Sequence, residues 1–278
     1  MSNGAALPRL VVVGAGLAGL TAARALAERF DVVVLDKSRG VGGRMATRRI
    51  GEATFDHGAQ FFTTHTPAFA AVVDEWTTAG VAEPWFHGRI GPQGIVDPDG
   101  HTRFRGVTSM NAVAQHLAVD LDVRRATAVT AVARDGKRWQ VRTESLTFTA
   151  DAVLMTPPVP QSLALLAAGS TALAPHDLAA LQAITYEPCI ALLAVLDGPS
   201  GLPEPGAVDP VDGPIDWMAD NQRKAVSAVP AVTIHATAEF IEQRRPSGSG
   251  SGRRGESRVR AGHHHGVLAD AGVAVRRR

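Results

Sequence analysis

The sequence contains a single cysteine among its 278 residues, so no disulfide can form within the chain. Proteins exported to oxidising compartments commonly carry paired cysteines, whereas a lone one fits a reducing environment, and we therefore expect a cytoplasmic protein. Cys189 stands at the start of an apolar run. We expect it to be a small buried hydrophobic side chain rather than a reactive thiol.

A long uninterrupted apolar run is also missing. The most apolar stretch, residues 7–27, is broken by three glycines and by Arg24, and no basic segment precedes it. A membrane helix needs about 20 mostly apolar residues, and a signal peptide needs a positively charged start. We therefore expect a soluble protein with neither a signal peptide nor a membrane anchor.

The chain as a whole lacks an excess of one charge, since its formal net charge is +1, but its two parts differ. Residues 242–278 carry nine arginines and three acids, whereas residues 1–241 carry 19 basic and 24 acidic side chains. Nothing in the larger part indicates nucleic-acid binding.

Residues 242–278 are rich in Gly, Ser and Arg and lack apolar periodicity, which predicts a disordered basic tail. The change after Phe240 is abrupt and favours an out-of-frame reading of GC-rich DNA. Three adjacent histidines, 263–265, could bind a metal, but a flexible chain offers no preformed geometry. The arginines could bind RNA or an acidic membrane, although any Arg-rich segment looks the same. We expect no metal site and no nucleic-acid or membrane partner.

Near its start the sequence carries a pattern of regular elements and glycines. An apolar run at residues 10–13 is followed by a helical pattern over residues 17–28, and a second apolar run at residues 32–35 ends on Asp36. Between the first run and the helix lie three glycines in the spacing Gly-x-Gly-x-x-Gly, namely Gly14, Gly16 and Gly19. This order predicts a βαβ unit that binds a dinucleotide.

Each of these residue types has a task in such a unit. Gly14 allows the sharp turn, Gly16 leaves room for a pyrophosphate against main-chain N–H groups, and Gly19 lets the helix pack on its strand. The phosphates then meet the positive end of the helix dipole. Asp36 is placed to accept hydrogen bonds from a ribose hydroxyl.

A second glycine-rich stretch follows Asp36 directly. Gly40, Gly42 and Gly43 form a loop that can lie close to a ligand, and the Arg44 guanidinium can pair with phosphate. The alternative is an ordinary solvated turn. Additional phosphate contacts favour FAD, which stays bound, over a nicotinamide cofactor that must leave.

A third stretch, FDHGAQFF, spans residues 55–62. Small Gly58 and Ala59 permit the close approach of a flat ring, Gln60 offers a donor and an acceptor to a heterocycle, and Phe61 can line an apolar wall. The same pattern also fits a buried strand end.

The segments VVVGAGLAGLTAARAL, LDKSRGVGGRMATRR and FDHGAQFF, in this order, resemble the renalase-like branch of the FAD-dependent amine oxidoreductases. The resemblance continues through DAVLMTPPVPQSLALL, YEPCIALLAVL and PIDWMADNQRK and covers roughly residues 8–240. It stops before the segment in which this family carries a Gly-Asp strand and a helix against the flavin. The chain is thus similar to a truncated family member.

The resemblance implies an α/β fold in which a Rossmann-type FAD-binding domain is interleaved with a smaller α+β substrate domain. The FAD-binding domain takes residues 1–68 and 105–160, and the substrate domain takes residues 69–104 and 161–241. The strands at residues 32–35, 11–13 and 152–155 are expected to be neighbours in one sheet.

The resemblance also implies site residues. Val129 would face the adenosine through its backbone, and Thr156 would close over the pyrophosphate. The substrate side would include Trp217, Asn221 and His235, although a lone histidine on a strand is more often structural. The residues expected to bind FAD are Gly14, Ala15, Gly16, Leu17, Ala18, Gly19, Asp36, Lys37, Gly43, Arg44, Met45, Gln60, Phe61, Val129 and Thr156.

By resemblance, the substrate is a dihydronicotinamide isomer that gives a hydride to flavin, with O2 as the electron acceptor and hydrogen peroxide as the product. No Ser-His-Asp set or carboxylate pair indicates acid/base machinery, and this reaction needs none. The alternatives are a primary-amine or polyamine oxidase, an NAD-dependent dehydrogenase, and a truncated inactive chain.

Overall fold

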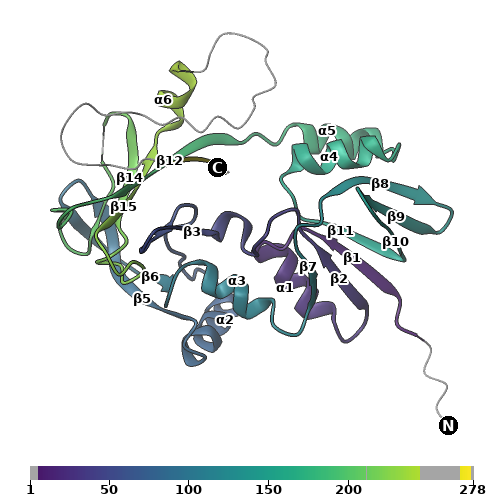
Figure 1. The fold of residues 1–278 in the computed structure, drawn as a ribbon, viewed down its shortest axis with the longest axis horizontal. Coiled ribbons are helices and arrows are strands. Elements are labelled where there is room, and N and C mark those ends of the chain that lie inside the picture. Colours follow the sequence, from purple (N-terminus) through teal and green to yellow (C-terminus); the bar gives the residue numbers. More distant parts are fainter. Residues whose placement is uncertain (1–5, 211, 245–269, 277–278) are drawn as a thin grey trace. The chain divides into compact units, whose positions relative to one another are not determined.

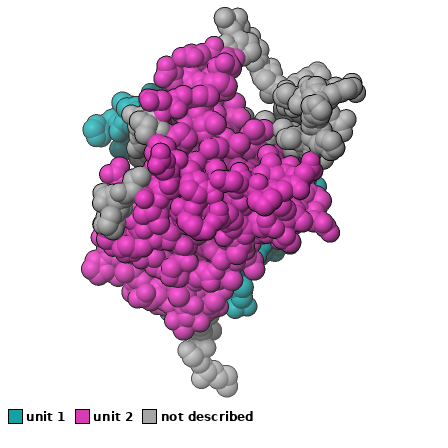
Figure 2. All heavy atoms as spheres, turned by 90° about the vertical axis from the view of Figure 1, so that its left-hand side faces the viewer, with its two compact units in different colours: residues 1–43, 114–185 teal, residues 44–113, 186–278 magenta. Residues whose placement is uncertain are grey.

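The computed structural model describes residues 6–210, 212–244 and 270–276, and Figure 1 labels its helices and strands. The chain forms two compact units, each assembled from two stretches of sequence (Figure 2). Unit 1 comprises residues 1–43 and 114–185, and unit 2 comprises residues 44–113 and 186–278. Within the described ranges, no helix combines the length and apolarity needed to cross a membrane.

A four-stranded parallel sheet with the order β11-β1-β2-β7 forms the centre of unit 1 (Figure 1). Its strands are β1 (Arg9–Val13), β2 (Asp31–Leu35), β7 (Asp122–Arg124) and β11 (Ala152–Met155). The adjacency of β2, β1 and β11 confirms the predicted arrangement. Valine-rich runs suit these strands because both faces of a parallel sheet are covered.

A smaller antiparallel sheet of unit 1 packs into the same core. It consists of β8 (Val129–Asp135), β9 (Arg138–Thr143) and β10 (Thr147–Ala150). Val132 and Val141 from this sheet are buried together with Val11 and Leu35 from the parallel sheet. The helix α1 (Leu17–Leu26) connects β1 to β2, as the glycine motif predicts.

Two helices that we predict in the substrate domain, α4 (Val159–Ala168) and α5 (Pro175–Gln182), belong to unit 1 instead. The end of α4 lies against β8, where a Cβ at Gly169 would come within 2.0 Å of the Val132 carbonyl oxygen. The Thr171 hydroxyl donates to the same oxygen at 2.8 Å. These close contacts hold the two helices on the sheet of unit 1, so the boundary that we predict at residue 160 is wrong.

Unit 2 contains a five-stranded antiparallel sheet with the order β13-β14-β15-β12-β16. Its strands are β12 (Glu187–Val195), β13 (Ala207–Val208), β14 (Ile215–Asp220), β15 (Ala231–Ala236) and β16 (Asp270–Arg276). Cys189 on β12 is buried, as predicted. Phe55 packs with Leu193 and Ala231 of this sheet, which explains why residues 44–68 belong to unit 2 and not to the predicted FAD-binding domain.

Two hairpins complete the strands of unit 2: β3 (Thr47–Ile50) with β4 (Ala53–Asp56), and β5 (Ala82–Gly91) with β6 (Gly94–Gly106). The remaining helices are α2 (Pro67–Thr78), α3 (Asn111–Leu117), α6 (Ala238–Gln243) and the one-turn 3-10 helix η1 (Gly43–Met45). The Thr66 side chain caps α2 by accepting from the Phe69 N–H, and Pro67 fits the first helical position.

The structure differs from the predicted disorder of residues 242–278 at Glu242 and Gln243, which end α6, and at the strand β16. β16 pairs antiparallel with β12, from Asp270 opposite Leu193 to Arg276 opposite Glu187. Its sequence, DAGVAVR, contains two β-branched valines, which favour a strand, and the Arg-rich composition of the whole segment masks this local preference. The histidines at 263–265 lie outside the described residues.

Candidate functional site

The first glycine loop of unit 1 leaves no room for side chains at two of its three glycines. Gly14 has a positive φ of 106°, and a Cβ there would come within 2.5 Å of the Thr156 hydroxyl oxygen. A Cβ at Gly19 would come within 2.0 Å of the Gly14 carbonyl oxygen. These two glycines therefore pack the loop against β11 and α1, as the motif predicts.

Gly16 differs from its neighbours because a Cβ there would meet nothing within 4 Å. It is the N-cap residue of α1, no side chain caps this helix, and its first turn contains no acid. The positive end of the helix dipole therefore faces open space at Gly16, which is the arrangement that accommodates a phosphate.

The second glycine loop lies beside the first. The Gly42 N–H donates to the Ala15 carbonyl at 2.8 Å, and Gly42 forms an isolated parallel bridge with Gly16. Gly43 has a φ of 54°, and a Cβ there would approach the Gly16 Cα to 3.3 Å. Two motifs that are separate in the sequence thus form one surface of main-chain atoms in unit 1.

Asp36 at the carboxyl end of β2 is turned toward this surface. Its Oδ2 accepts from the Ala15 N–H at 2.7 Å, and its Oδ1 accepts from the Ser38 N–H at 2.7 Å. A carboxylate has about four acceptor positions, so these two bonds leave capacity for the hydroxyls of a ribose. The side chain of Lys37 instead donates to Gln161 Oε1 at 3.3 Å.

Thr156 and Val129 occupy supporting positions in unit 1. The Thr156 hydroxyl donates to the carbonyls of Val13 at 2.8 Å and Gly14 at 3.2 Å, and so holds the end of β1. The Thr127 N–H donates to the Asp36 carbonyl at 2.8 Å, which brings the start of β8 to the end of β2. Val129 begins that strand and is half-buried in the core.

In unit 2, Arg44 and the third motif meet through their backbones. The Ala59 N–H donates to the Arg44 carbonyl at 2.8 Å, and a Cβ at Gly58 would come within 2.0 Å of the same oxygen. The Arg44 side chain is exposed, whereas Met45 is buried. Gly58 is thus needed because a side chain there would clash with the Arg44 carbonyl, so its small size serves the protein's own backbone and not only the flat ring that the sequence suggests.

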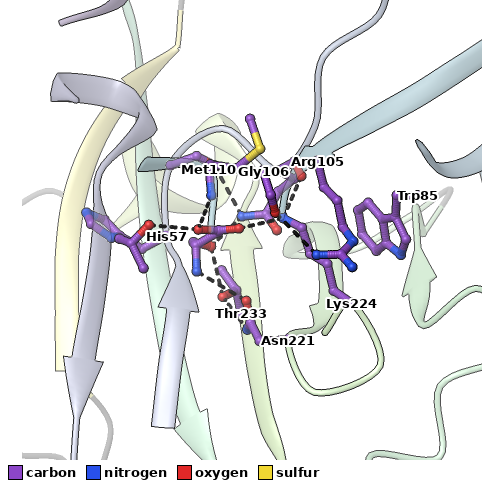
Figure 3. A network of polar contacts seen from close by, with 12 residues as sticks. His57, Trp85, Arg105, Gly106, Met110, Asn221, Lys224 and Thr233 are labelled. Atoms are coloured by element: carbon purple, nitrogen blue, oxygen red, sulfur yellow. Dashed lines mark hydrogen bonds and ion pairs between the residues drawn. The ribbon is translucent and has the colours of Figure 1, made fainter. Parts of the chain in front are cut away.

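A buried ion pair, which sequence reasoning missed, joins Lys224 to Asp56 near the start of the third motif (Figure 3). Lys224 Nζ lies 2.9 Å from Asp56 Oδ2, and both side chains are 0% exposed. Nζ also donates to the Gln60 carbonyl at 2.6 Å and lies 4.9 Å from the centroid of the Trp85 ring. Burial lowers the pKa of Lys224, and the attraction of Asp56 opposes that change.

The other oxygen of Asp56 is also fully used. Oδ1 accepts from the Thr47 hydroxyl at 2.8 Å and from the Met110 N–H at 2.9 Å. The main-chain N–H of Asp56 donates to Asn221 Oδ1 at 3.1 Å, and the main-chain carbonyl of Asp56 accepts from the Thr233 hydroxyl at 3.0 Å. Asp56 is therefore the centre of a polar network that links β4 to β15 and to the turn after β14 (Figure 3).

The structure uses Asn221 inside this network. Besides accepting from Asp56, its side chain donates to the Thr233 hydroxyl at 2.9 Å and to the Ala231 carbonyl at 3.4 Å. The residue is 0% exposed. These bonds occupy both ends of the amide, so a structural role replaces the substrate role that we predict from the resemblance.

The other two substrate-side residues are buried in unit 2 as well. The ring of His235 forms a hydrogen bond of 3.0 Å between its Nε2 and the His57 carbonyl. Trp217 packs against Phe61 with 5.5 Å between ring centroids, and Phe61 packs edge-on against Phe86 at 6.0 Å. Trp217 Nε1 is buried and has no hydrogen-bond partner in the described structure.

Nothing in the described ranges resembles a metal centre, because they hold no group of three or more His, Cys, Asp or Glu side chains that could bind an ion. Gln60, by contrast, is buried with an unpartnered acceptor: its Oε1 has no hydrogen-bond partner among the described residues. This oxygen can accept a hydrogen bond that no group of the described residues supplies.

Comparison with known proteins matches residues 12–76 to the family model of an NAD(P)-binding Rossmann-like domain. Hydroxyneurosporene desaturase from Rubrivivax gelatinosus is 38% identical over 89 residues, which amount to 32% of this chain and only 16% of that protein. The chain therefore matches a small part of this curated relative.

Solved structures with similar folds include putrescine oxidase bound to putrescine, with a TM-score of 0.65 and 14% identity over 85% of this chain and 77% of that one. A fatty acid isomerase from P. acnes has a TM-score of 0.58 and 11% identity over 82% and 76% of the two chains. At these identities the similarity establishes the fold. The fold is mixed α/β with a Rossmann-like domain, as predicted.

Proposed function

We propose that this chain is an FAD-dependent oxidoreductase of the renalase-like group. The observation that carries the proposal is the surface formed by the two glycine loops, with the open face of Gly16 at the start of α1. Main-chain N–H groups and the helix dipole would bind the pyrophosphate there. Asp36 would accept hydrogen bonds from the ribose of the adenosine, and Arg44 remains a proposed phosphate contact.

The proposed substrate is a small dihydronicotinamide isomer in the cytoplasm. Bound FAD supplies the acceptor for a hydride from this substrate and the route by which O2 is reduced to hydrogen peroxide. The residues of unit 2 would position the substrate rather than transfer protons. Phe61, Phe86 and Trp217 form an apolar aromatic wall, and Trp217 Nε1 would donate to a polar atom of the substrate.

A primary-amine or polyamine oxidase is the second candidate, and the fold shared with putrescine oxidase favours it. Both candidates release hydrogen peroxide, so the substrate distinguishes them. Peroxide release from dihydronicotinamide isomers supports the first candidate, and release from putrescine or benzylamine supports the second. A colourless protein that binds NAD would instead support a dehydrogenase, and a protein that binds no cofactor would be an inactive chain.

The flavin site is tested with a pair of glycine variants. Gly16 and Gly198 both have open space where a Cβ would stand. Gly16→Val and Gly198→Val should therefore both fold, but only Gly16→Val fills the proposed pyrophosphate position. We expect purified wild type and Gly198→Val to show a flavin absorption spectrum and Gly16→Val to lose it. Equal flavin content in all three proteins would refute the site.

A further inference from the structure

Gln60 is held at both of its ends by bonds within unit 2. Its side-chain Nε2 donates to the Asp56 carbonyl at 2.6 Å and to the Gly58 carbonyl at 3.2 Å. Its own carbonyl accepts from Lys224 Nζ at 2.6 Å. Because both neighbours of the amide are carbonyl oxygens, the nitrogen must face them, and this network fixes the orientation of the amide.

This orientation determines what Gln60 can still bind. Its two amide N–H groups are used within the protein, whereas Oε1 is buried and has no partner among the described residues. A buried acceptor without a partner is unfavourable, and only a donor can satisfy it. The sequence alone allows Gln60 to act as donor or acceptor, and the structure leaves it the acceptor role.

Stability alone does not explain why Lys224 and Asp56, which both bond to Gln60, form a buried ion pair. Removing two charges from water is unfavourable, and well-packed apolar side chains are often at least as stable as a buried pair. Lys224 and Asp56 are both 0% exposed, and each forms a bond that reaches Gln60: Lys224 through its ammonium group and Asp56 through its carbonyl. The pair therefore fixes the main chain at residues 56 and 60.

We propose that Lys224 and Asp56 are positioning residues that hold Gln60 so that its Oε1 accepts a hydrogen bond from a ring N–H of the bound flavin. The inference rests on the function proposed above. The oxidised flavin ring has one N–H, at N3, and its other ring heteroatoms and carbonyls are acceptors. A fixed acceptor at Gln60 suits this single donor, and protein hydrogen bonds of this kind tune a flavin.

The test compares FAD with 3-methyl-FAD, in which a methyl group replaces the N3 hydrogen. Both are titrated into the full-length apoprotein and followed by flavin fluorescence, and the readout is the ratio of the two dissociation constants. We expect wild type to bind FAD roughly tenfold more tightly than 3-methyl-FAD, since one hydrogen bond is lost and Oε1 stays unsatisfied. Gln60→Met removes the acceptor and should bring the ratio close to one.

Lys224→Met is the decisive variant. If Lys224 positions Gln60, the ratio falls toward one in this variant. If Lys224 serves stability alone, the protein becomes less stable while the ratio stays at its wild-type value, and the inference is overturned. Lys224→Met with Asp56→Asn removes both charges together, so this double variant keeps the test possible should the single variant fail to fold.

Val73→Ala is the matched control. Val73 is 1% exposed on α2, and no hydrogen bond of the Asp56 network involves its side chain. The variant should lose stability and keep the wild-type ratio. Failure of wild type to bind FAD would refute the proposed function itself, whereas FAD binding with the same ratio in wild type and Lys224→Met would refute only the positioning role.

Discussion

The glycine loops of unit 1 and the Asp56 network of unit 2 are two opposite ways of building a polar site. The loops consist of main-chain atoms at residues 14–19 and 40–43, and no ionised side chain except Asp36 bonds to them in the described structure. The network consists of side chains from distant parts of the sequence, with Asp56 and Lys224 separated by 168 positions. The first site depends on the absence of side chains and the second on complete pairing of charges, so the two should respond differently to substitution.

The largest effect is expected at the ion pair. Lys224→Met leaves the Asp56 carboxylate buried without a cation and should lower the free energy of unfolding by about 3–5 kcal/mol, measured by urea denaturation. Arg9→Met provides the matched comparison, because Arg9 pairs with Asp31 at the surface, where such a pair contributes about 0–1 kcal/mol. Equal losses in the two variants would contradict the burial of Lys224.

The next largest effect is expected at Gly19, where the first glycine loop leaves no room for a side chain. Gly19→Ala places a Cβ against the Gly14 carbonyl and should lower the free energy of unfolding by about 1–3 kcal/mol, because α1 must shift from its strand. Gly16→Ala adds the same methyl group to open space and should leave stability within about 0.5 kcal/mol of wild type. Similar denaturation midpoints for the two variants would contradict the difference in available space between Gly19 and Gly16.

A smaller effect is expected at Asp36, the one carboxylate of the first site. Asp36→Ala should raise the dissociation constant of FAD roughly tenfold, because the ribose loses a hydrogen bond to a charged acceptor. Asp31→Ala, at the exposed start of the same strand, serves as the control and should keep the wild-type dissociation constant in a fluorescence titration. If Asp36→Ala also keeps the wild-type dissociation constant, the carboxylate does not contact the cofactor.

The smallest effect concerns pH in unit 2. Burial lowers the pKa of His57, the positive charge of Arg48 acts in the same direction, and Asp56 opposes them. Below the ordinary histidine pKa of about 6.5, the unfolded chain therefore binds more protons at this residue than the folded one, and stability falls as the pH drops. Urea midpoints at pH 7 and pH 5.5 should differ less in His57→Gln than in wild type, and an unchanged difference would contradict this.

The contrast between the two sites also explains what could be predicted from the sequence. The βαβ unit was predictable because its three glycines, helix and acid lie within a short stretch, and each has a fixed geometric task. The strands β1, β2 and β11 were predictable as runs of apolar residues, and their adjacency in one sheet was expected from the domain organisation that the family resemblance implies. In patterns of this kind, the residues that determine the structure lie close together in the sequence.

The rest could not be predicted because it depends on partners far along the chain. Lys224 lies in the polar run DNQRK, which is typical of a solvated turn, and nothing nearby indicates Asp56 as its partner. Asn221 in the same run has a side chain that suits a ligand equally well. The sequence of α4 does not reveal that β8 is the surface it packs on, which misplaced the domain boundary.

The separation of Asp56 from Lys224 also has a consequence for biosynthesis. A ribosome makes β4 long before it reaches the turn after β14, and until then the carboxylate at residue 56 has no cation to accompany it out of water. The interior around β4 can therefore enclose this carboxylate in its charged form only after Lys224 has been made, when most of the polypeptide is complete.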